Sequence, residues 1–247
     1  MQDKNWLVRI GDFFFKWRNI AFPVILVTLF VLFPPPAEYW GMHWIEDFKD
    51  IFAAFMIAAG LGFRSATIGW AYIKRGGLNK QVYADKLVIE GFFGMCRNPL
   101  YVGNMLIYTG IFILHGHPFV VVAGTALYWF IYESIITAEE YYLKNKFGQD
   151  YDAYCAKVPR WIPDFSRYRD SVKDMSFSFT RSIAKDYSTI FNACIAIAAI
   201  ELIEQYAHYP WPAFVLTAQI AAVPLSLMLV AVLVIKRLKK TGRLKLS

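Results

Sequence analysis

Two short polar segments stand beside apolar runs in this chain and hold the residue types that could do chemistry. The first is "GMCRNPLYVG" at residues 94–103, in which Arg97 and Asn98 directly precede a long apolar stretch. The second begins with the paired carboxylates Glu139 and Glu140, which follow another apolar run. Carboxylates suit cationic groups, whereas an arginine suits a carboxylate or a phosphate. If the fold brings them together, the two segments can bind a ligand that carries both signs of charge.

The composition indicates which elements must position these residues. Hydrophobic residues make up 57% of the 247 residues, and the mean hydropathy is +0.36. Runs of about 20 apolar residues match a hydrocarbon core about 30 Å thick. We therefore expect an all-α, polytopic integral membrane bundle of about six transmembrane helices. The predicted spans are residues 19–33, 51–73, 99–115, 118–137, 188–206 and 211–235.

The N-terminal stretch mixes charges with aromatic residues, unlike the uninterrupted apolar region of a cleaved signal peptide. Trp6, Phe13 and Trp17 fall on one face of a helix, which predicts an interfacial helix leading into the first span. A merely polar start to that span is the alternative. We expect residues 1–50 to comprise this helix, the first span and an outer loop.

Positive charge is concentrated on one set of loops. Of the 26 Lys and Arg residues, 25 lie in residues 1–19, 64–97, 138–187 and 236–247. The positive-inside rule makes these segments cytoplasmic, and with them both termini of a multi-pass protein. A bacterial inner membrane or the endoplasmic reticulum would satisfy this orientation. The net charge of +7 needs no nucleic acid to explain it and would attract anionic lipid headgroups.

The histidines and cysteines predict no metal site. All four histidines fall on the outer side in this topology, and "HGH" at residues 115–117 reads as a polar turn between two helices. The three cysteines match no metal-binding spacing. Chemistry on the cytoplasmic side must therefore use carboxylates, Arg, Tyr or backbone groups, or a substrate that is already ionised.

The two polar segments also carry a family resemblance. "GFFGMCRNPLYVG" resembles the G-x-Y-x-x-x-R-[HN]-P-x-Y-x-G element of the isoprenylcysteine carboxyl methyltransferase and phospholipid methyltransferase superfamily. "EEYYLKNKFGQDYDAYCAKVPRWIP" resembles the second element of that superfamily, and "FRSATIGWAYIKRGG" its preceding helix, with Arg64 at the charged position. The resemblance covers residues 51–163. Asn98 stands where the family often has histidine, and Phe93 where it has tyrosine.

The resemblance implies a methyltransferase that uses S-adenosylmethionine, in a pocket among the cytoplasmic helix ends. It makes residues 51–163 the methyltransferase core, followed at 164–247 by a surface segment and a C-terminal transmembrane hairpin. Carried onto this sequence, the cofactor-binding residues are Gly91, Arg97, Asn98, Pro99, Tyr101, Gly103, Glu139 and Glu140.

The acceptor is expected to be a membrane lipid or a lipidated molecule. A carboxylate or phosphate acceptor, slightly favoured, needs a cation to hold it, and Arg160, Arg64 and Arg167 are the candidates, Arg160 first. For Arg64 and Arg167, the alternative is an interfacial arginine that snorkels to lipid headgroups. An amine acceptor would instead need Glu139 or Glu140 as a base. We thus predict catalytic roles for Arg160, Glu140 and Arg64.

Two other classes remain open from the sequence. A membrane sterol or enoyl reductase that uses NADPH shares parts of both elements, although it usually has more spans and lacks the Glu-Glu pair. A non-enzymatic membrane scaffold would not need Glu139, Glu140 and Arg97 together at the inner interface. The sequence leaves the oligomeric state and the role of the C-terminal hairpin undecided.

Overall fold

The computed structural model describes residues 5–36, 43–70 and 82–243, and every regular element within these ranges is helical. Five helices there are long and apolar enough to cross a membrane, and a sixth apolar helix is shorter. The six are α1 (Trp6–Leu32), α2 (His43–Trp70), α3 (Pro99–His115), α4 (Thr125–Phe147, preceded by the π-helical turn Val120–Gly124), α7 (Phe179–His208) and α8 (Trp211–Lys240). The predicted all-α bundle of a multi-pass membrane protein is confirmed.

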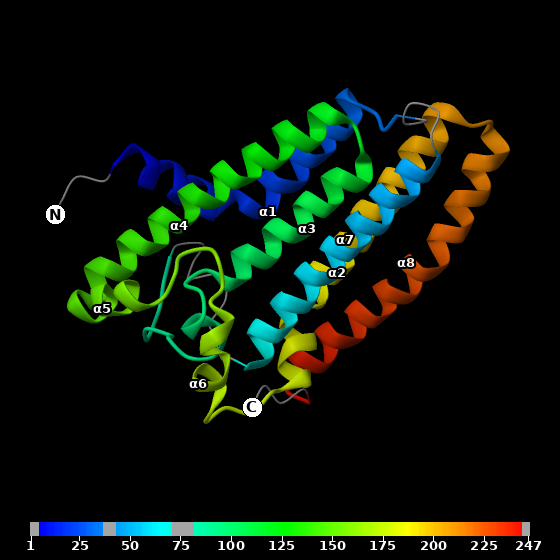
Figure 1. Cartoon of the computed structure of the whole chain (residues 1–247). Coiled ribbons are helices and arrows are strands. Elements are labelled where there is room, and N and C mark those ends of the chain that lie inside the picture. The colour runs from blue at the N-terminus through cyan, green and yellow to red at the C-terminus, as the bar shows by residue number, and fades with distance from the viewer. Residues whose placement is uncertain (1–4, 37–42, 71–81, 244–247) are drawn as a thin grey trace.

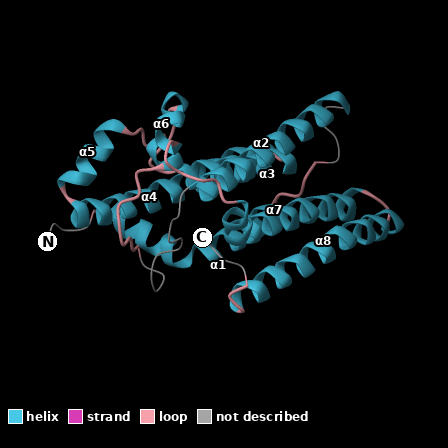
Figure 2. Cartoon of the chain, turned by 90° about the horizontal axis from the view of Figure 1, so that it is seen from below, coloured by secondary structure: helices cyan, strands magenta, loops and turns pink. Residues whose placement is uncertain are grey.

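The helices pack in pairs that follow the chain only in part. Helix α3 packs along α2, α4 along α1, and α7 between α2 and α8 (Figures 1 and 2). The start of α1 and the end of α8 lie toward the same end of the bundle (Figure 1). That end also holds the short elements, and we call it the polar end. They are η1 (Gly91–Gly94), α5 (Gln149–Lys157), η3 (Phe165–Arg167) and α6 (Tyr168–Val172).

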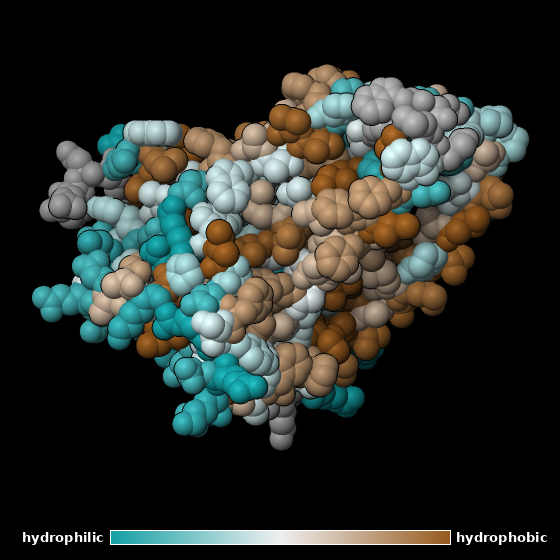
Figure 3. Space-filling model, viewed as in Figure 1, coloured by the Kyte–Doolittle hydropathy of each residue, from teal (hydrophilic) through white to brown (hydrophobic). Residues whose placement is uncertain are grey.

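The hydropathy of the surface also distinguishes the polar end from the rest of the bundle. Polar residues gather over α5 and α6, whereas apolar residues cover the face around α2 and α8 (Figure 3). Helix α8 is the extreme case, because Val232 is its one buried residue while many of its Leu and Val side chains are exposed. Lipid tails are as apolar as these side chains, so their exposure is favourable in a bilayer.

Glycines set the closest approaches between helices. A Cβ built on Gly11 of α1 would lie 1.9 Å from the backbone oxygen of Ser134 in α4. A Cβ on Gly103 of α3 would lie 2.4 Å from Cγ of Arg64 and 2.9 Å from the backbone oxygen of Gly60 in α2. Small residues at such crossings let backbones approach closely in membranes. Gly103 therefore serves the α2–α3 packing, whereas its cofactor-binding role stays a prediction.

Replacing Gly11 by valine is expected to lower the melting temperature of the protein in detergent. The added side chain would overlap the backbone at Ser134, and overpacking of this kind costs about 1–3 kcal/mol. Gly62 of α2 is the matched control, because a Cβ there meets nothing within 4 Å, and Gly62→Val should melt like the wild type. Equal melting temperatures for the two variants would show that α1 does not depend on this contact.

The helix limits differ from the predicted spans in an instructive way. Helix α2 begins at His43 rather than at residue 51, and α7 begins at Phe179, within the predicted surface segment. Helix α1 is continuous through the stretch predicted as interfacial. Hydropathy locates the part of a helix that lies in hydrocarbon, whereas polar residues can extend the same helix beyond it. The last residues of the span predicted at 51–73 and both chain ends lie outside the described residues.

Candidate functional site

A cavity of about 940 Å³ begins among the loops of the polar end and continues into the bundle between α1, α3, α4 and α7. Many of the residues predicted from the sequence meet at its wall. The predicted residues that line it are Arg64, Arg97, Asn98, Tyr101, Glu139 and Glu140. Of the other predicted residues, all of which are described, Gly91, Pro99, Gly103 and Arg160 are not among the lining residues.

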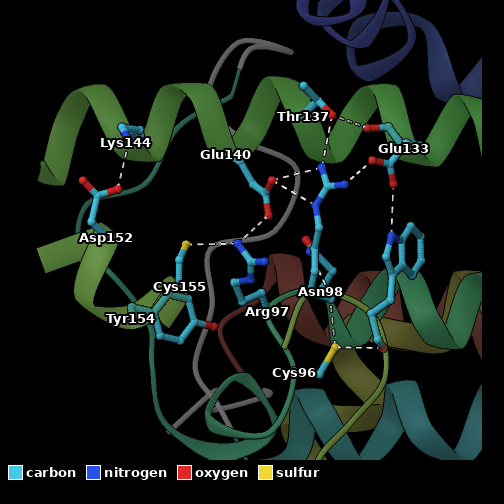
Figure 4. Close-up of polar contacts among 12 residues, drawn as sticks. Cys96, Arg97, Asn98, Glu133, Thr137, Glu140, Lys144, Asp152, Tyr154 and Cys155 are labelled. Carbon is cyan, nitrogen blue, oxygen red and sulfur yellow. Dashed lines mark hydrogen bonds and ion pairs between the residues drawn. The ribbon is translucent and has the colours of Figure 1, made fainter. Parts of the chain in front are cut away.

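Glu140 joins two arginines at the charged part of the wall (Figure 4). Its Oε1 lies 3.1 Å from a terminal nitrogen of Arg97, and its Oε2 accepts from Nε of Arg160 at 3.0 Å. Burial works against the charge of Arg97, but chiefly the carboxylate of Glu140 outweighs it and raises the pKa of this guanidinium. The same opposition of burial and neighbouring carboxylates raises the pKa of Arg160. Both arginines are therefore held charged at the site.

The guanidinium of Arg160 contacts three residues on one face of α4. Besides Glu140, it forms an ion pair with Glu133 and donates to Oγ1 of Thr137 at 3.1 Å. Nε1 of Trp161 donates to the second oxygen of Glu133 at 3.0 Å. The sequence analysis did not identify Glu133. An acid within an apolar run, seven residues before Glu140 and thus on the same helix face, was the signal that could have found it.

The two polar segments of the sequence are bonded directly to each other. The backbone N–H of Arg97 donates to the carbonyl of Pro159 at 2.9 Å, and the side-chain amide of Asn98 donates to the carbonyl of Arg160 at 3.1 Å. The thiol of Cys96, 3.2 Å from the carbonyl of Trp161, is fully buried, and burial raises its pKa to about 11. These bonds fix the first turn of α3 beside the carboxylates of α4.

Helix α3 enters the site through a tightly turned segment. Gly91 has φ +61°, in the left-handed region that favours glycine, and begins the turn that leads to α3. Asn98 is the N-cap residue and Pro99 the first residue of the helix. Proline lacks a backbone N–H, but no hydrogen bond is lost at this position because the first N–H groups of a helix have no acceptor within it. One turn later, the hydroxyl of Tyr101 donates to Oε1 of Glu139 at 2.9 Å, so that both residues face the cavity from adjoining helices.

Helix α1 adds a cation that the sequence analysis missed. Arg18 lines the cavity and interacts electrostatically with Glu139 and Tyr101. Its guanidinium lies 4.4 Å from the centre of the Phe15 ring. No motif marks Arg18, because its importance comes only from the packing of α1 on α4.

Arg64 lies in α2, one of the helices long enough to span a membrane, and belongs to a separate network. Its Nε and one terminal nitrogen lie 3.2 and 2.5 Å from the two carboxylate oxygens of Asp186 in α7. The same nitrogen donates to Thr189 at 3.1 Å, and the other bonds Asn104 of α3. The side chains of Arg64 and Asp186 are 3% and 0% exposed. The sequence does not single out Asp186, because the mixture of charges and aromatic residues around it predicts a segment on the membrane surface.

Aromatic residues form the remaining wall at the polar end. Tyr151 and Tyr154 of α5 line the cavity with Phe93 and Leu143, and the Tyr154 hydroxyl donates to the Phe93 carbonyl at 2.7 Å. Among the described residues, Nε of Arg97 is buried without a hydrogen-bond partner. Charged groups, an orphaned donor and flat apolar surfaces together suit a ligand with a zwitterionic part and a planar part.

The opposite end of the bundle holds the histidine-containing turn. The imidazole of His115 stacks on Phe30, with ring centres 4.4 Å apart, and Nε2 of His208 lies 2.7 Å from the carbonyl oxygen of Pro35. Within residues 5–36, 43–70 and 82–243, no three or more His, Cys, Asp or Glu residues lie close enough to hold a metal ion.

One family model and several known proteins are similar to this chain. The family model for phospholipid methyltransferases matches residues 48–150. Protein-S-isoprenylcysteine O-methyltransferase A of Arabidopsis thaliana is 30% identical over 139 residues, which are 56% of this chain and 67% of that protein. The nickel-cobalt-cadmium resistance protein NccN of Alcaligenes xylosoxydans xylosoxydans is 27% identical over 205 residues, 81% of this chain and 87% of that protein. No solved structure matches the chain.

A helical membrane bundle with this charged cavity and these relatives is a membrane methyltransferase. The chain belongs to the isoprenylcysteine carboxyl methyltransferase and phospholipid methyltransferase superfamily. The predicted membership and enzyme class are thereby confirmed, in preference to the reductase and the scaffold. The family match covers most of α2 and all of α3 and α4, whereas α1 and α7, which also line the cavity, lie outside it.

Proposed function

We propose that this protein transfers the methyl group of S-adenosylmethionine to a lipid or lipidated acceptor at the cytoplasmic face of its membrane. One observation carries the proposal. A single cavity joins the charged wall formed by Arg97, Glu139 and Glu140 to an apolar interior between membrane-spanning helices. A water-soluble, charged donor could thus bind at the charged wall while the hydrophobic part of the acceptor stays among apolar residues.

The residues at the polar end fit S-adenosylmethionine, which carries a carboxylate, an ammonium and a sulfonium. The buried Nε of Arg97 has no hydrogen-bond partner among the described residues and suits the carboxylate. Glu139 and Glu140 suit the two cations, while Tyr151, Tyr154 and Phe93 offer surfaces for the adenine. Asn98, Pro99, Gly91 and Gly103 would act by shaping the turn and helix on which these groups stand.

The acceptor is proposed to be an anionic oxygen, with a carboxylate first. Bound S-adenosylmethionine supplies a methyl carbon to which that oxygen bonds as the carbon–sulfur bond breaks, its electron pair staying on the sulfur of S-adenosylhomocysteine. A carboxylate needs no general base, in keeping with the position of all four histidines in the sequence near the opposite end. The plant relatives are protein-S-isoprenylcysteine O-methyltransferases, which favours a carboxylate over a phosphate or an amine.

The protein's own residues hold and align the reactants. Arg160 is proposed to hold Glu140 in place, because its guanidinium also binds Glu133 and Thr137. The alternative role for Arg160 is direct contact with the acceptor. Arg64 lines the acceptor side of the cavity, although Asp186 balances its charge. Arg167 bonds the carbonyl of Lys157 and is the weakest of the three candidates. Holding two reactants aligned is the main source of rate in such a displacement.

Binding and labelling experiments test the proposal. In detergent, S-adenosylhomocysteine should raise the melting temperature of the protein, whereas NADPH should leave it unchanged, because binding to the folded state alone stabilises it. Membranes incubated with methyl-labelled S-adenosylmethionine should incorporate label into lipid or lipidated protein as base-labile esters. Stabilisation by NADPH alone would refute the cofactor assignment, and base-stable label in phospholipid would favour an amine acceptor.

A tag on the C-terminus that is accessible only from outside would refute the cytoplasmic orientation.

A further inference from the structure

The cavity continues beyond its charged wall into the bundle. Pockets that enclose a single small ligand measure roughly 300–1,000 Å³, and this cavity of about 940 Å³ lies at the top of that range. Its inner part runs away from the charged wall between apolar side chains, and we call it the apolar arm. Its apolar lining includes Leu26 of α1, Ile107 and Ile111 of α3, and Ala193, Ala196 and Ala199 of α7. The same stretches of α3 and α7 also bring Asn104, Tyr108 and Asn192 to the cavity wall.

The arm has a definite length and one wall of small residues. From Tyr101 to Ile111 the wall follows ten residues of α3, or about 15 Å at the helical rise, which is about half the hydrocarbon thickness. On α7, alanines recur at positions 193, 196 and 199, so that small side chains face the arm along nearly two turns. Larger side chains at these positions would fill the space.

Helix α7 is held as a fixed wall at the point where the arm begins. The ion pair between Arg64 and Asp186 and the bond from Arg64 to Thr189 tie α7 to α2, and Arg64 also bonds Asn104 of α3. Both members of the ion pair are buried. The alanines follow Asp186 by two to almost four turns, so this anchor sets their distance from α3.

We propose that α7 gauges the apolar chain of the methyl acceptor: a single prenyl or acyl chain lies in the arm, and the alanines of α7 set the length that is accepted. The inference rests on the proposed function and concerns the chain length that the site accepts, in an acceptor with an anionic oxygen at one end of one long apolar chain. The occupant is the acceptor's chain because the arm is continuous with the charged wall, so one molecule can fill the arm and present its head beside Glu139. Helix α7 lies outside residues 48–150, which the family model matches, so the length limit would come from the C-terminal hairpin.

The test uses side chains that shorten the arm. Ala199 lies deepest, so Ala199→Phe should reduce kcat/KM at least tenfold for S-prenyl cysteine carboxylates of three and four isoprene units while sparing one and two. Ala196→Leu, a smaller change nearer the charged wall, should extend the loss to the two-unit acceptor. The matched control is Ala222→Phe on the exposed surface of α8, which should behave like the wild type. Binding of S-adenosylhomocysteine should be unchanged in all three variants.

The outcomes separate the inference from the function on which it rests. Retention of the wild-type chain-length profile in both α7 variants would overturn the inference, and so would an equal loss for every chain length. In either case, methylation by the wild type would leave the proposed function standing. If the wild type bound no S-adenosylhomocysteine and methylated no member of the series, the proposed function would fall and the inference with it.

Discussion

Exchanging Glu140 for glutamine is expected to lower the affinity for S-adenosylmethionine about a hundredfold. The carboxylate of Glu140 bridges Arg97 and Arg160 and lines the cavity, so the amide would lose charge-assisted contacts to both arginines and to the ligand. Interactions with a charged group are worth about 1.5–3 kcal/mol each, and a net loss of about 3 kcal/mol corresponds to a factor of about one hundred. Isothermal titration with S-adenosylmethionine in detergent measures the change directly.

Asp152→Asn is the matched control for this exchange. Asp152 is also a carboxylate paired with a cation, Lys144, at the polar end (Figure 4), but both side chains are more than half exposed. Exposed pairs contribute little, so its affinity should equal that of the wild type. Unchanged affinity in Glu140→Gln would remove Glu140 from the cofactor site.

Arg160→Lys separates the two roles proposed for that residue. Lysine keeps the charge but not the planar fork that reaches Glu133, Thr137 and Glu140 together. If Arg160 positions Glu140, the affinity for the cofactor should fall. A sharp loss of methylation at unchanged cofactor affinity would instead make Arg160 the anchor of the acceptor.

Replacing Arg64 by methionine is expected to cost about 3–5 kcal/mol of folding stability, the largest loss among these variants. It would leave the carboxylate of Asp186, which is 0% exposed, without the guanidinium that binds both of its oxygens. Breaking one partner of a buried ion pair typically has an effect of this size, because a charge is left in a poorly solvated place. A large drop in melting temperature in detergent, with loss of the correctly folded fraction, is the measurement.

The double variant Arg64→Met, Asp186→Leu tests whether the loss of stability comes from the carboxylate left without Arg64 or from the loss of the other contacts of Arg64. Removing both charges eliminates the uncompensated carboxylate, so the double variant should be more stable than Arg64→Met alone. Its methylation of long-chain acceptors should remain impaired, since the anchor between α7 and the core is gone. A double variant no more stable than Arg64→Met would show that Arg64 stabilises the fold chiefly through Leu100 and Asn104.

The sequence alone determined the helical membrane architecture and the identity of much of the charged wall. Apolar runs of bilayer length have few structural options, because in hydrocarbon every backbone polar group must be bonded within the element. The two polar segments are recognisable because each keeps its charged and polar residues close together in the chain. Arg97 and Asn98 are neighbours, and so are Glu139 and Glu140.

The tertiary structure decided which charges pair, and therefore what each can do. Arg64 and Asp186 stand 122 residues apart, and neither a period nor a motif links them. The sequence allows Arg160 to bind an acceptor, but in the fold its guanidinium contacts Glu133, 27 residues away on α4. Hydropathy reports how each residue partitions into lipid, but not which distant residue lies opposite it. The packing of α2 on α7, and of the segment after α5 on α4, fixes those partners. Charges that are costly in lipid find their counter-charges at these contacts.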